Sequence, residues 1–396
     1  MSMKRVVFIN AHWNTLIMKT PMTFLFNIKP PQKYSILFNE LIKKPDVQVC
    51  SFVTSEGSSI PRSVRFPFKN LVACFESWYT FRKNGFTNND IITLTKISEI
   101  RPDDIVLAFV HTRGGSDKLN IINARKYLHL NQYWGHSIEE LNKSLPYAQD
   151  YLLEANTAKE GNFLLRTNLA IGYRFHILPF FVSERFVCKK SFNIRKKKAI
   201  ATGTLAKFQA ECDCSRHYGT PYMHKMRKIL FDNKDSINEY IDVLISPYVE
   251  TNNKKVEKHY KGLLGVLYSF YKLRFLKLGA QKNYFSFNIV EKYNEYQMAV
   301  VPEEIVDVPA IGAFEAMSCG CAFIGVDHSM YRDLGMIPDI HYISYDGSLD
   351  NLKDKIVYYQ KHQDELQIIA AAGYEFANKT LCKENILDLF CKIVGI

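Results

Sequence analysis

Short apolar runs alternate with polar or helix-like stretches along the first half of the chain. The runs are rich in Val, Ile, Leu and Phe, which suit strands buried on both faces. The strands predicted from them are 5–9, 47–53, 104–110, 126–130, 151–155 and 175–180. Because strands separated by helical stretches form βα units, this half predicts a parallel sheet.

The same rhythm restarts at Ala199 and becomes regular towards the end of the chain. The strands predicted in this half are 199–205, 241–245, 298–301 and 321–326. The predicted helices are 222–231, 287–296, 311–319, 352–372 and 383–394. The alternation again favours a parallel sheet covered by helices.

A polar and basic run at 188–198 lies between the two halves. A solvated linker is its simplest interpretation, and contact with a membrane surface or an acidic acceptor is the alternative. The chain of 396 residues exceeds what one core usually supports, so two domains are expected. The predicted organisation is a first domain at 1–185, a linker at 186–198, a second domain at 199–378, and a helical segment at 379–396 that packs back on the first domain.

The segment 300–327 combines a strand, a polar loop, a helix and a second strand. Pro309 can occupy the first turn of the helix, where its missing N–H does no harm, and Gly320 can close the helix in a left-handed conformation. The strand that follows is too apolar to lie on a surface. This unit points the amino end of a helix at a cleft, where free N–H groups and the helix dipole favour a diphosphate.

An acidic residue, Asp307, precedes Glu315 by eight positions, and Glu315 begins the run Glu-Ala-Met-Ser-Cys-Gly. This segment resembles the donor-site signature of retaining GT-B glycosyltransferases, and the likeness extends over about residues 285–396. Asp307 stands where that family usually has Glu, and Val308-Pro309 replaces its Gly-Phe. The resemblance implies an α/β chain with two Rossmann-like domains facing a central cleft, the acceptor bound by the first domain and the nucleotide-sugar by the second.

The resemblance also implies roles for single residues. Glu315 is expected to accept hydrogen bonds from the ribose hydroxyls, and Asp307 to contact the donor sugar where the reaction occurs. The family places a basic residue against the phosphates, and Arg227 is favoured because a guanidinium can grip phosphate oxygens in a bidentate way. The other donor-binding candidates are Gly203, Lys207, Lys228, Ile311 and Gly312. Retention of the anomeric configuration, without a metal or cofactor, is implied as well.

A histidine after the fourth strand of the first domain commonly serves catalysis or contacts the sugar in this family, and His111 follows the apolar run 104–110. His12 and His136 lie in similar loops, next to Trp13 and close to Trp134, whose rings could stack on a sugar. We expect His111 to be catalytic and the other four to bind the acceptor. A hydrogen-bonded structural histidine is the alternative.

The net charge of +11 favours anionic partners such as nucleotide diphosphates, anionic lipid headgroups or nucleic acid. Zinc-finger, RNP and helix-turn-helix signatures are missing from the sequence, so nucleic acid is not expected. The aromatic and basic run 260–277 can form an interfacial helix on an anionic membrane or, more simply, a core helix with basic ends.

The nine cysteines lack the density of a disulfide scaffold, so we expect reduced thiols in a cytoplasmic protein, with a peripheral position at the plasma membrane as an extension. Cys212 and Cys214, with His217 and His224, have the residue types of a zinc site. Their spacing is not the usual one, so no metal is expected.

These observations predict a glycosyltransferase that moves a sugar from a nucleotide-sugar to a hydroxyl of a glycan acceptor. Bacterial surface polysaccharide, such as lipopolysaccharide, or a lipid-linked glycan is the expected product. Three alternatives stay open at this point: a sugar-nucleotide epimerase with the same donor site, a transferase that uses a CMP-linked acid such as CMP-Kdo, and a basic nucleic-acid-binding protein.

Overall fold

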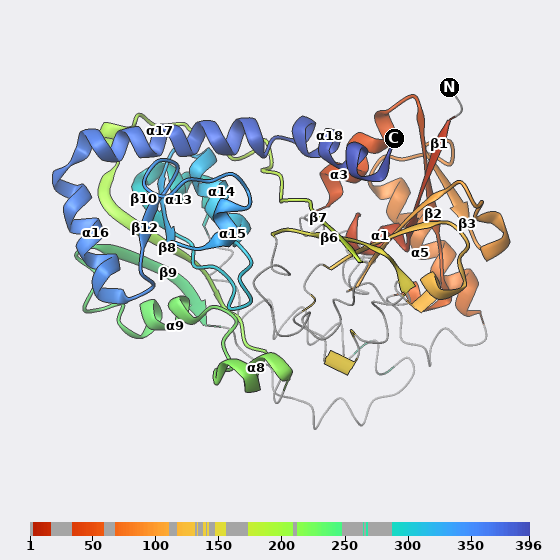
Figure 1. Cartoon of the computed structure of the whole chain (residues 1–396), viewed down its shortest axis with the longest axis horizontal. Helices are drawn as coiled ribbons and strands as arrows, with labels where there is room; N and C mark the ends of the chain where they lie inside the picture. The colour runs from red at the N-terminus through yellow and green to blue at the C-terminus, as the bar shows by residue number, and fades with distance from the viewer. Residues whose placement is uncertain are drawn as a thin grey trace.

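The fold is described from a computed structural model of the chain. The model describes residues 3–16, 34–58, 68–110, 117–130, 133, 138–139, 141, 147–155, 173–208, 212–247, 264, 267 and 287–396. These residues form two halves, each built on a parallel sheet, and Figure 1 shows the two sheets at opposite sides of the molecule. The fold is α/β, as the alternating pattern predicts.

The first half contains a seven-stranded sheet with the order β3-β2-β1-β4-β5-β6-β7. Its strands are β1 (Lys4–Ile9), β2 (Val47–Phe52), β3 (Ile91–Leu94), β4 (Ile105–Phe109), β5 (Arg125–His129), β6 (Asp150–Leu153) and β7 (Arg174–Ile177). Its helices are α1 (Ala11–Asn14), α3 (Ser35–Lys43) and α5 (Lys69–Lys83), and its 3-10 turns are η1 (Ser55–Gly57), η2 (Ile97–Glu99) and η3 (Asp117–Ile121). The strand order reverses between β1 and β4, whose side chains are almost all buried.

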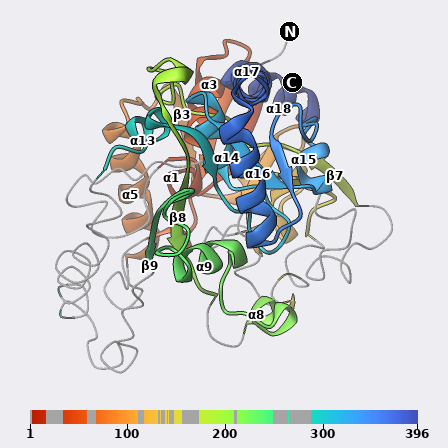
Figure 2. The same cartoon turned by 90° about the vertical axis from the view of Figure 1, so that its left-hand side faces the viewer.

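The second half contains a five-stranded sheet with the order β12-β11-β10-β8-β9. Its strands are β8 (Lys196–Leu205), β9 (Ile241–Pro247), β10 (Tyr296–Val300), β11 (Ala322–Val326) and β12 (Ile343–Tyr345). Its helices are α8 (Asp213–Tyr218), α9 (Lys225–Asp232), α13 (Ile289–Glu295), α14 (Ile311–Ser318), α15 (Ser329–Arg332), α16 (Leu349–Lys361) and α17 (Gln363–Thr380). Figure 2 shows α16 and α17 lying over this sheet. The strand order reverses between β8 and β10.

The predicted linker contains the 3-10 turn η6 (Phe192–Ile194) and the beginning of β8. The strand starts at Lys196, three residues before the predicted 199. Lys196 and Lys198 can lie in the strand because both place their ammonium groups near Asp242 of β9, at 3.7 and 3.2 Å. Part of the basic run is therefore ordered strand with a paired acid rather than solvated chain.

The end of the chain returns to the first half. Helix α18 (Lys383–Val394) packs against α3, and Figure 1 shows the C-terminus beside that helix. Tyr127 of β5 donates a hydrogen bond to the carbonyl of Ile393 at 3.1 Å, and Arg125 donates to the carbonyl of Val394 at 3.2 Å. The second half is thus tied to the first by α17 and α18 as well as by the linker.

Candidate active site

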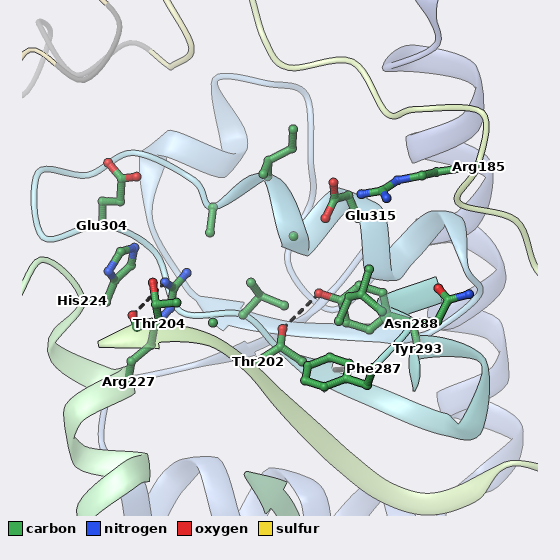
Figure 3. A pocket seen from close by; sticks show the side chains of 16 residues that line it. Arg185, Thr202, Thr204, His224, Arg227, Phe287, Asn288, Tyr293, Glu304 and Glu315 are labelled. Atoms are coloured by element: carbon green, nitrogen blue, oxygen red, sulfur yellow. Dashed lines mark hydrogen bonds between the residues drawn. The ribbon is translucent and has the colours of Figure 1, made fainter. Parts of the chain in front are cut away.

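A cavity of about 580 Å³ lies at the carboxyl ends of β8 and β10, where the order of the second sheet reverses. Figure 3 shows its side chains, which come from β8, from the amino ends of α9, α13 and α14, and from the chain that crosses between the halves. The lining residues are Arg185, Thr202, Gly203, Thr204, His224, Arg227, Phe287, Asn288, Ile289, Tyr293, Val301, Glu304, Ala310, Ile311, Gly312 and Glu315. Such a reversal point is where open parallel sheets bind their ligands.

The amino ends of α9 and α14 both open on this cavity. Helix α14 begins after Ala310, whose side chain has no oxygen to accept from the first N–H groups, and α9 begins after His224, which lines the cavity itself. The exposed N–H groups of a first helical turn carry a partial positive charge. Two such turns at one cavity favour an anionic ligand.

Helix α14 ends just before Gly320, and β11 follows shortly after it. The N–H of Gly320 bonds to the carbonyl of Met317 at 2.8 Å and that of Cys321 to the carbonyl of Ala316 at 3.0 Å. These bonds form a Schellman motif, which needs the left-handed φ of +82° that Gly320 adopts, as predicted. Pro309 lies just outside the helix instead of in its first turn.

Arg227 forms the basic part of the cavity. Its side chain is buried, and the guanidinium donates to the carbonyls of Thr204 and Pro302, each at 3.3 Å. A Cβ on Gly203 would lie 2.7 Å from the Arg227 Cζ and Nε atoms, and Gly203 has a φ of +135°. The arginine is therefore placed by the absence of a side chain at Gly203, because any other residue would occupy its position.

Helix α14 carries Glu315 on the side that faces the cavity. The Glu315 side chain is half-buried, and Figure 3 shows the Arg185 side chain extending towards it from the chain between the halves. Below them Thr202 and the buried Tyr293 share a hydrogen bond of 3.0 Å. A Cβ on Gly312 would lie 2.9 Å from Val301 and 3.2 Å from the Tyr293 hydroxyl, so this glycine allows α14 to approach β10 closely.

An acidic loop joins β10 to α14. The N–H of Glu304 bonds to the carbonyl of Val308 at 3.0 Å, and the loop turns through Asp307, which has a left-handed φ of +59°. Glu304 lines the cavity, whereas Asp307 does not and instead lies 3.7 Å from Nε2 of His328. Behind the loop, burial raises the pKa of Glu303, which accepts a hydrogen bond from Tyr331 at 3.3 Å. Of the three carboxylates of this loop, only Glu304 forms the cavity wall.

Among the solved structures that are similar to this one are three that it matches over almost its full length. These are sucrose-phosphate synthase from Thermosynechococcus elongatus (TM-score 0.56, 11% identity, 99% of this chain and 98% of that one), HepE from Anabaena in complex with UDP and glucose (0.54, 9%, 98% and 99%), and a glycosyltransferase from Rickettsia africae ESF-5 (0.51, 10%, 99% and 98%). The chain has the GT-B fold. No protein-family model and no curated protein sequence matches the chain.

Most donor-binding candidates of the second GT-B half meet at the cavity, namely Gly203, Arg227, Ile311, Gly312 and Glu315. Lys207 and Lys228 do not line it. Lys228 pairs with Asp232 one turn along α9, and both lysines lie 5.4 Å from the centre of the Tyr222 ring. Their predicted contact with the phosphates stays a prediction.

The described candidates of the first GT-B half, His12 and Trp13, lie away from the cavity. Nε2 of His12 lies 2.8 Å from the carbonyl oxygen of Gly57, and the indole N–H of Trp13 donates to the same oxygen. His12 is fully buried, and this burial lowers its pKa to about 4. Neither side chain lines the cavity. The other candidates of this half, His111, Trp134 and His136, lie outside the described residues, as does all of the run 260–277 except positions 264 and 267.

Glu154, a buried carboxylate directly after β6, was not predicted as a site residue from the sequence. Oε1 of Glu154 accepts a hydrogen bond from Tyr34 at 2.5 Å, and Oε2 is buried without a hydrogen-bond partner among the described residues. Burial and the nearby charges of Glu154 and Glu304 raise the pKa of Tyr34. Because Glu304 is part of the cavity wall and its charge acts on Tyr34, the pair of Tyr34 and Glu154 in the first half lies near the cavity. Its one signal in the sequence is an acid at the carboxyl end of an apolar strand.

The described residues contain no group of three or more His, Cys, Asp or Glu side chains that could hold a metal ion. No helix among them is long and apolar enough to cross a bilayer. The independence from metal stays a prediction.

Proposed function

We propose that this protein is a glycosyltransferase that moves a sugar from a nucleoside diphosphate to a hydroxyl of a glycan acceptor. The observation that carries the proposal is the convergence of two helix amino ends, Arg227 and Glu315 on one cavity at the reversal point of the second sheet. The structures of similar fold include HepE from Anabaena in complexes with UDP and with UDP-glucose, which favours a UDP-linked donor here too.

The parts of the donor suit different sides of the cavity. The diphosphate would lie at the amino end of α14, because the unpaired N–H groups and the buried charge of Arg227 both favour anions there. Glu315 would accept hydrogen bonds from the ribose hydroxyls, which are neutral donors that suit an ionised carboxylate. The sugar would then extend towards Glu304, on the side of the cavity nearest the acidic loop.

In the reaction the bond between the anomeric carbon and the leaving phosphate oxygen breaks, and the acceptor oxygen forms a bond to that carbon. The proton of the acceptor hydroxyl passes in the overall change to the leaving diphosphate. Arg227 and the helix amino ends would stabilise the negative charge that develops on the diphosphate. The resemblance to retaining enzymes leads us to propose that the product keeps the anomeric configuration of the donor.

The acceptor would enter from the first half of the molecule. We place its reacting hydroxyl near Oε2 of Glu154, because this buried oxygen lacks a partner among the described residues while Tyr34 holds the other carboxylate oxygen. A buried carboxylate oxygen that accepts no hydrogen bond is costly unless a ligand supplies one. A lipid-linked or surface glycan is the acceptor class that we propose.

A thermal-shift screen tests the donor site directly. UDP-, GDP-, ADP- and CMP-sugars are compared on the wild type, on Glu315→Ala, and on Glu375→Ala as a control in which an exposed acid of α17 is lost. We expect one nucleotide class to stabilise the wild type and the control equally, and Glu315→Ala to lose about 1.5–3 kcal/mol of binding free energy. Stabilisation by no nucleotide, or equal stabilisation of all three proteins, would contradict the proposal.

The acidic loop offers a second test of the same proposal. Because Glu304 lines the cavity and Asp307 does not, Glu304→Gln should slow sugar transfer or donor hydrolysis more than Asp307→Asn, with nucleotide affinity changed little by either. If Asp307→Asn slowed the reaction more than Glu304→Gln, Asp307 and not Glu304 would contact the sugar. Release of free nucleotide would separate a transferase from an epimerase, which interconverts the sugar and keeps it attached.

A further inference from the structure

Helix α5 has its large apolar side chains on the outside. The exposed fractions are 68% for Leu71, 51% for Phe75 and 44% for Trp78, and 65% for Phe68, which caps the helix. The buried residues of the helix are Ala73, Glu76, Ser77, Thr80 and Phe81. A helix at the surface of a soluble protein normally turns its apolar side inwards, so the pattern of α5 is largely reversed.

Polar contacts fix this orientation. The hydroxyl of Ser58 donates to a carboxylate oxygen of Glu76 at 3.0 Å, and the helix packs against η1 and α1. Glu76 is fully buried. Rotating the helix to bury its aromatic residues would expose this carboxylate and break its hydrogen bond with Ser58. The apolar side therefore faces outwards because η1, Ser58 and α1 hold the polar side.

The charges on α5 suit a negative partner. Arg82 and Lys83 lie in its last turn and Lys69 in its first, whereas the single acid of the helix, Glu76, is buried. Arg82 lies on the same helical side as Leu71 and Trp78, at spacings of eleven and four residues. Phe75 and Trp78 have ring centres 5.8 Å apart, so the exposed aromatic residues form one cluster.

We propose that this outer side of α5, formed by Phe68, Leu71, Phe75, Trp78 and Arg82, docks on an anionic lipid surface. Aromatic residues beside basic ones are the composition of helices that lie in the headgroup region of a bilayer. The proposal concerns a binding surface and does not depend on the donor chemistry.

Helix α5 lies close to the carboxyl edge of the first sheet. The helix contacts α1 and η1, which follow the carboxyl ends of β1 and β2. Docking would therefore bring the carboxyl edge of the first sheet close to the lipid headgroups. A lipid-linked acceptor could then reach the first half of the molecule without leaving the membrane.

Vesicle sedimentation with the full-length protein tests the proposal. Vesicles of phosphatidylcholine are compared with vesicles that also contain phosphatidylglycerol, for the wild type, Leu71→Ser and Ile368→Ser. Ile368 on α17 is 69% exposed and Leu71 is 68% exposed, so the two variants remove equally accessible apolar side chains from different surfaces. We expect the wild type to bind the anionic vesicles and to lose that binding at high salt.

The variants decide whether α5 carries the contact. Leu71→Ser should weaken binding about tenfold, as expected when one large apolar side chain no longer enters the headgroup region, and Ile368→Ser should change it less than about twofold. Trp78 fluorescence should shift to shorter wavelength with anionic vesicles, judged against Trp78→Phe. Equal binding of both serine variants, or no binding of the wild type, would overturn the proposal. If the wild type were a dimer that does not bind vesicles, and Leu71→Ser were a monomer on a sizing column, the partner of this surface would be a second copy of the chain and not a lipid surface.

Discussion

The two halves of the molecule differ in what the described residues form at the carboxyl ends of their central strands. Between β8 and β10 the chain leaves a cavity of about 580 Å³ with a buried arginine and a carboxylate in its wall. At the ends of β1 and β2 the described residues are packed: Asn10 and Thr54 bond to each other, and His12 and Trp13 bond to Gly57. A Cβ on Gly57 would lie 2.3 Å from Asn10. The described residues therefore form an open site at the ends of β8 and β10 and a closed corner at the ends of β1 and β2.

Small residues account for this difference. Gly203 and Gly312 lie at the open point, where the side chains that they lack would meet Arg227, Val301 and Tyr293. At the closed point the space next to Gly57 is filled by the side chain of Asn10. A glycine next to a strand end makes room for a ligand only if neighbouring side chains do not fill the space. In the proposed function the acceptor lies near Glu154, which has a buried oxygen to satisfy.

The largest effect is expected at Gly203. Gly203→Ala forces a Cβ onto the guanidinium of Arg227 and a side chain onto a φ of +135°, which should cost at least about 3 kcal/mol of folding free energy and lower nucleotide affinity. Gly219→Ala is the control, since Gly219 has a φ of +62° and meets nothing within 4 Å. Chemical unfolding of both variants should show the control losing about 1 kcal/mol. Equal losses would mean that Arg227 does not depend on Gly203.

The closed corner predicts a dependence on pH. Burial lowers the pKa of His12 to about 4, from the usual value of 6.5, so the folded state binds this proton less readily than the unfolded state does. The contribution of neutral His12 is complete above the unfolded pKa and is lost as pH falls from about 6.5 to about 4, by about 3 kcal/mol in all. His12→Gln keeps a donor towards Gly57 and cannot be protonated. Melting temperatures measured across this range should fall less steeply for the variant, and parallel curves would contradict the assignment.

Glu154→Gln should produce a smaller loss that affects only the acceptor. Replacing a charged acceptor oxygen by an amide should reduce acceptor-dependent turnover by about 10- to 100-fold, because a hydrogen bond to a charged group is worth about 1.5–3 kcal/mol. Nucleotide affinity should stay unchanged, since Glu154 does not line the donor cavity. Tyr34→Phe, which removes the hydroxyl that holds the carboxylate, should give part of the same loss. A loss of nucleotide binding in either variant would place Glu154 on the donor side.

The smallest effect is expected at Lys228. Its ammonium group pairs with Asp232 at the surface, and such pairs contribute little. Lys228→Ala should therefore change nucleotide affinity by less than about 0.5 kcal/mol. A larger loss, measured by calorimetry, would show that the lysine leaves Asp232 and reaches the phosphates when the donor binds.

Much of the fold of the second half could be predicted from sequence. The predicted helix 311–319 and strand 321–326 nearly coincide with α14 and β11, because Gly320 and a fully apolar run mark them. Strand β3 was not predicted, since only its first and last residues are buried, and β12 is only three residues long. The predicted helix 352–372 is in fact part of two helices that meet at His362, where the sequence has no proline or glycine to mark a break.

The candidate site was best predictable where one segment holds several of its residues, although Gly203 and Arg227 were also predicted from the resemblance and line the cavity. Ile311, Gly312 and Glu315 follow one another along α14, and a local pattern can reveal them. Arg185 and Glu154 come from the first half and approach the cavity only through the way the halves meet. Isolated residues such as Arg185 and Glu154 form no local sequence pattern from which a site could be predicted.

A crystal structure with bound nucleotide tests the central claim most directly. The protein is crystallised with whichever nucleoside diphosphate stabilises it. We predict the ribose hydroxyls at Glu315 and the phosphates between the amino end of α14 and Arg227. A nucleotide bound in the first half of the molecule, with the cavity between β8 and β10 left unoccupied, would contradict the account.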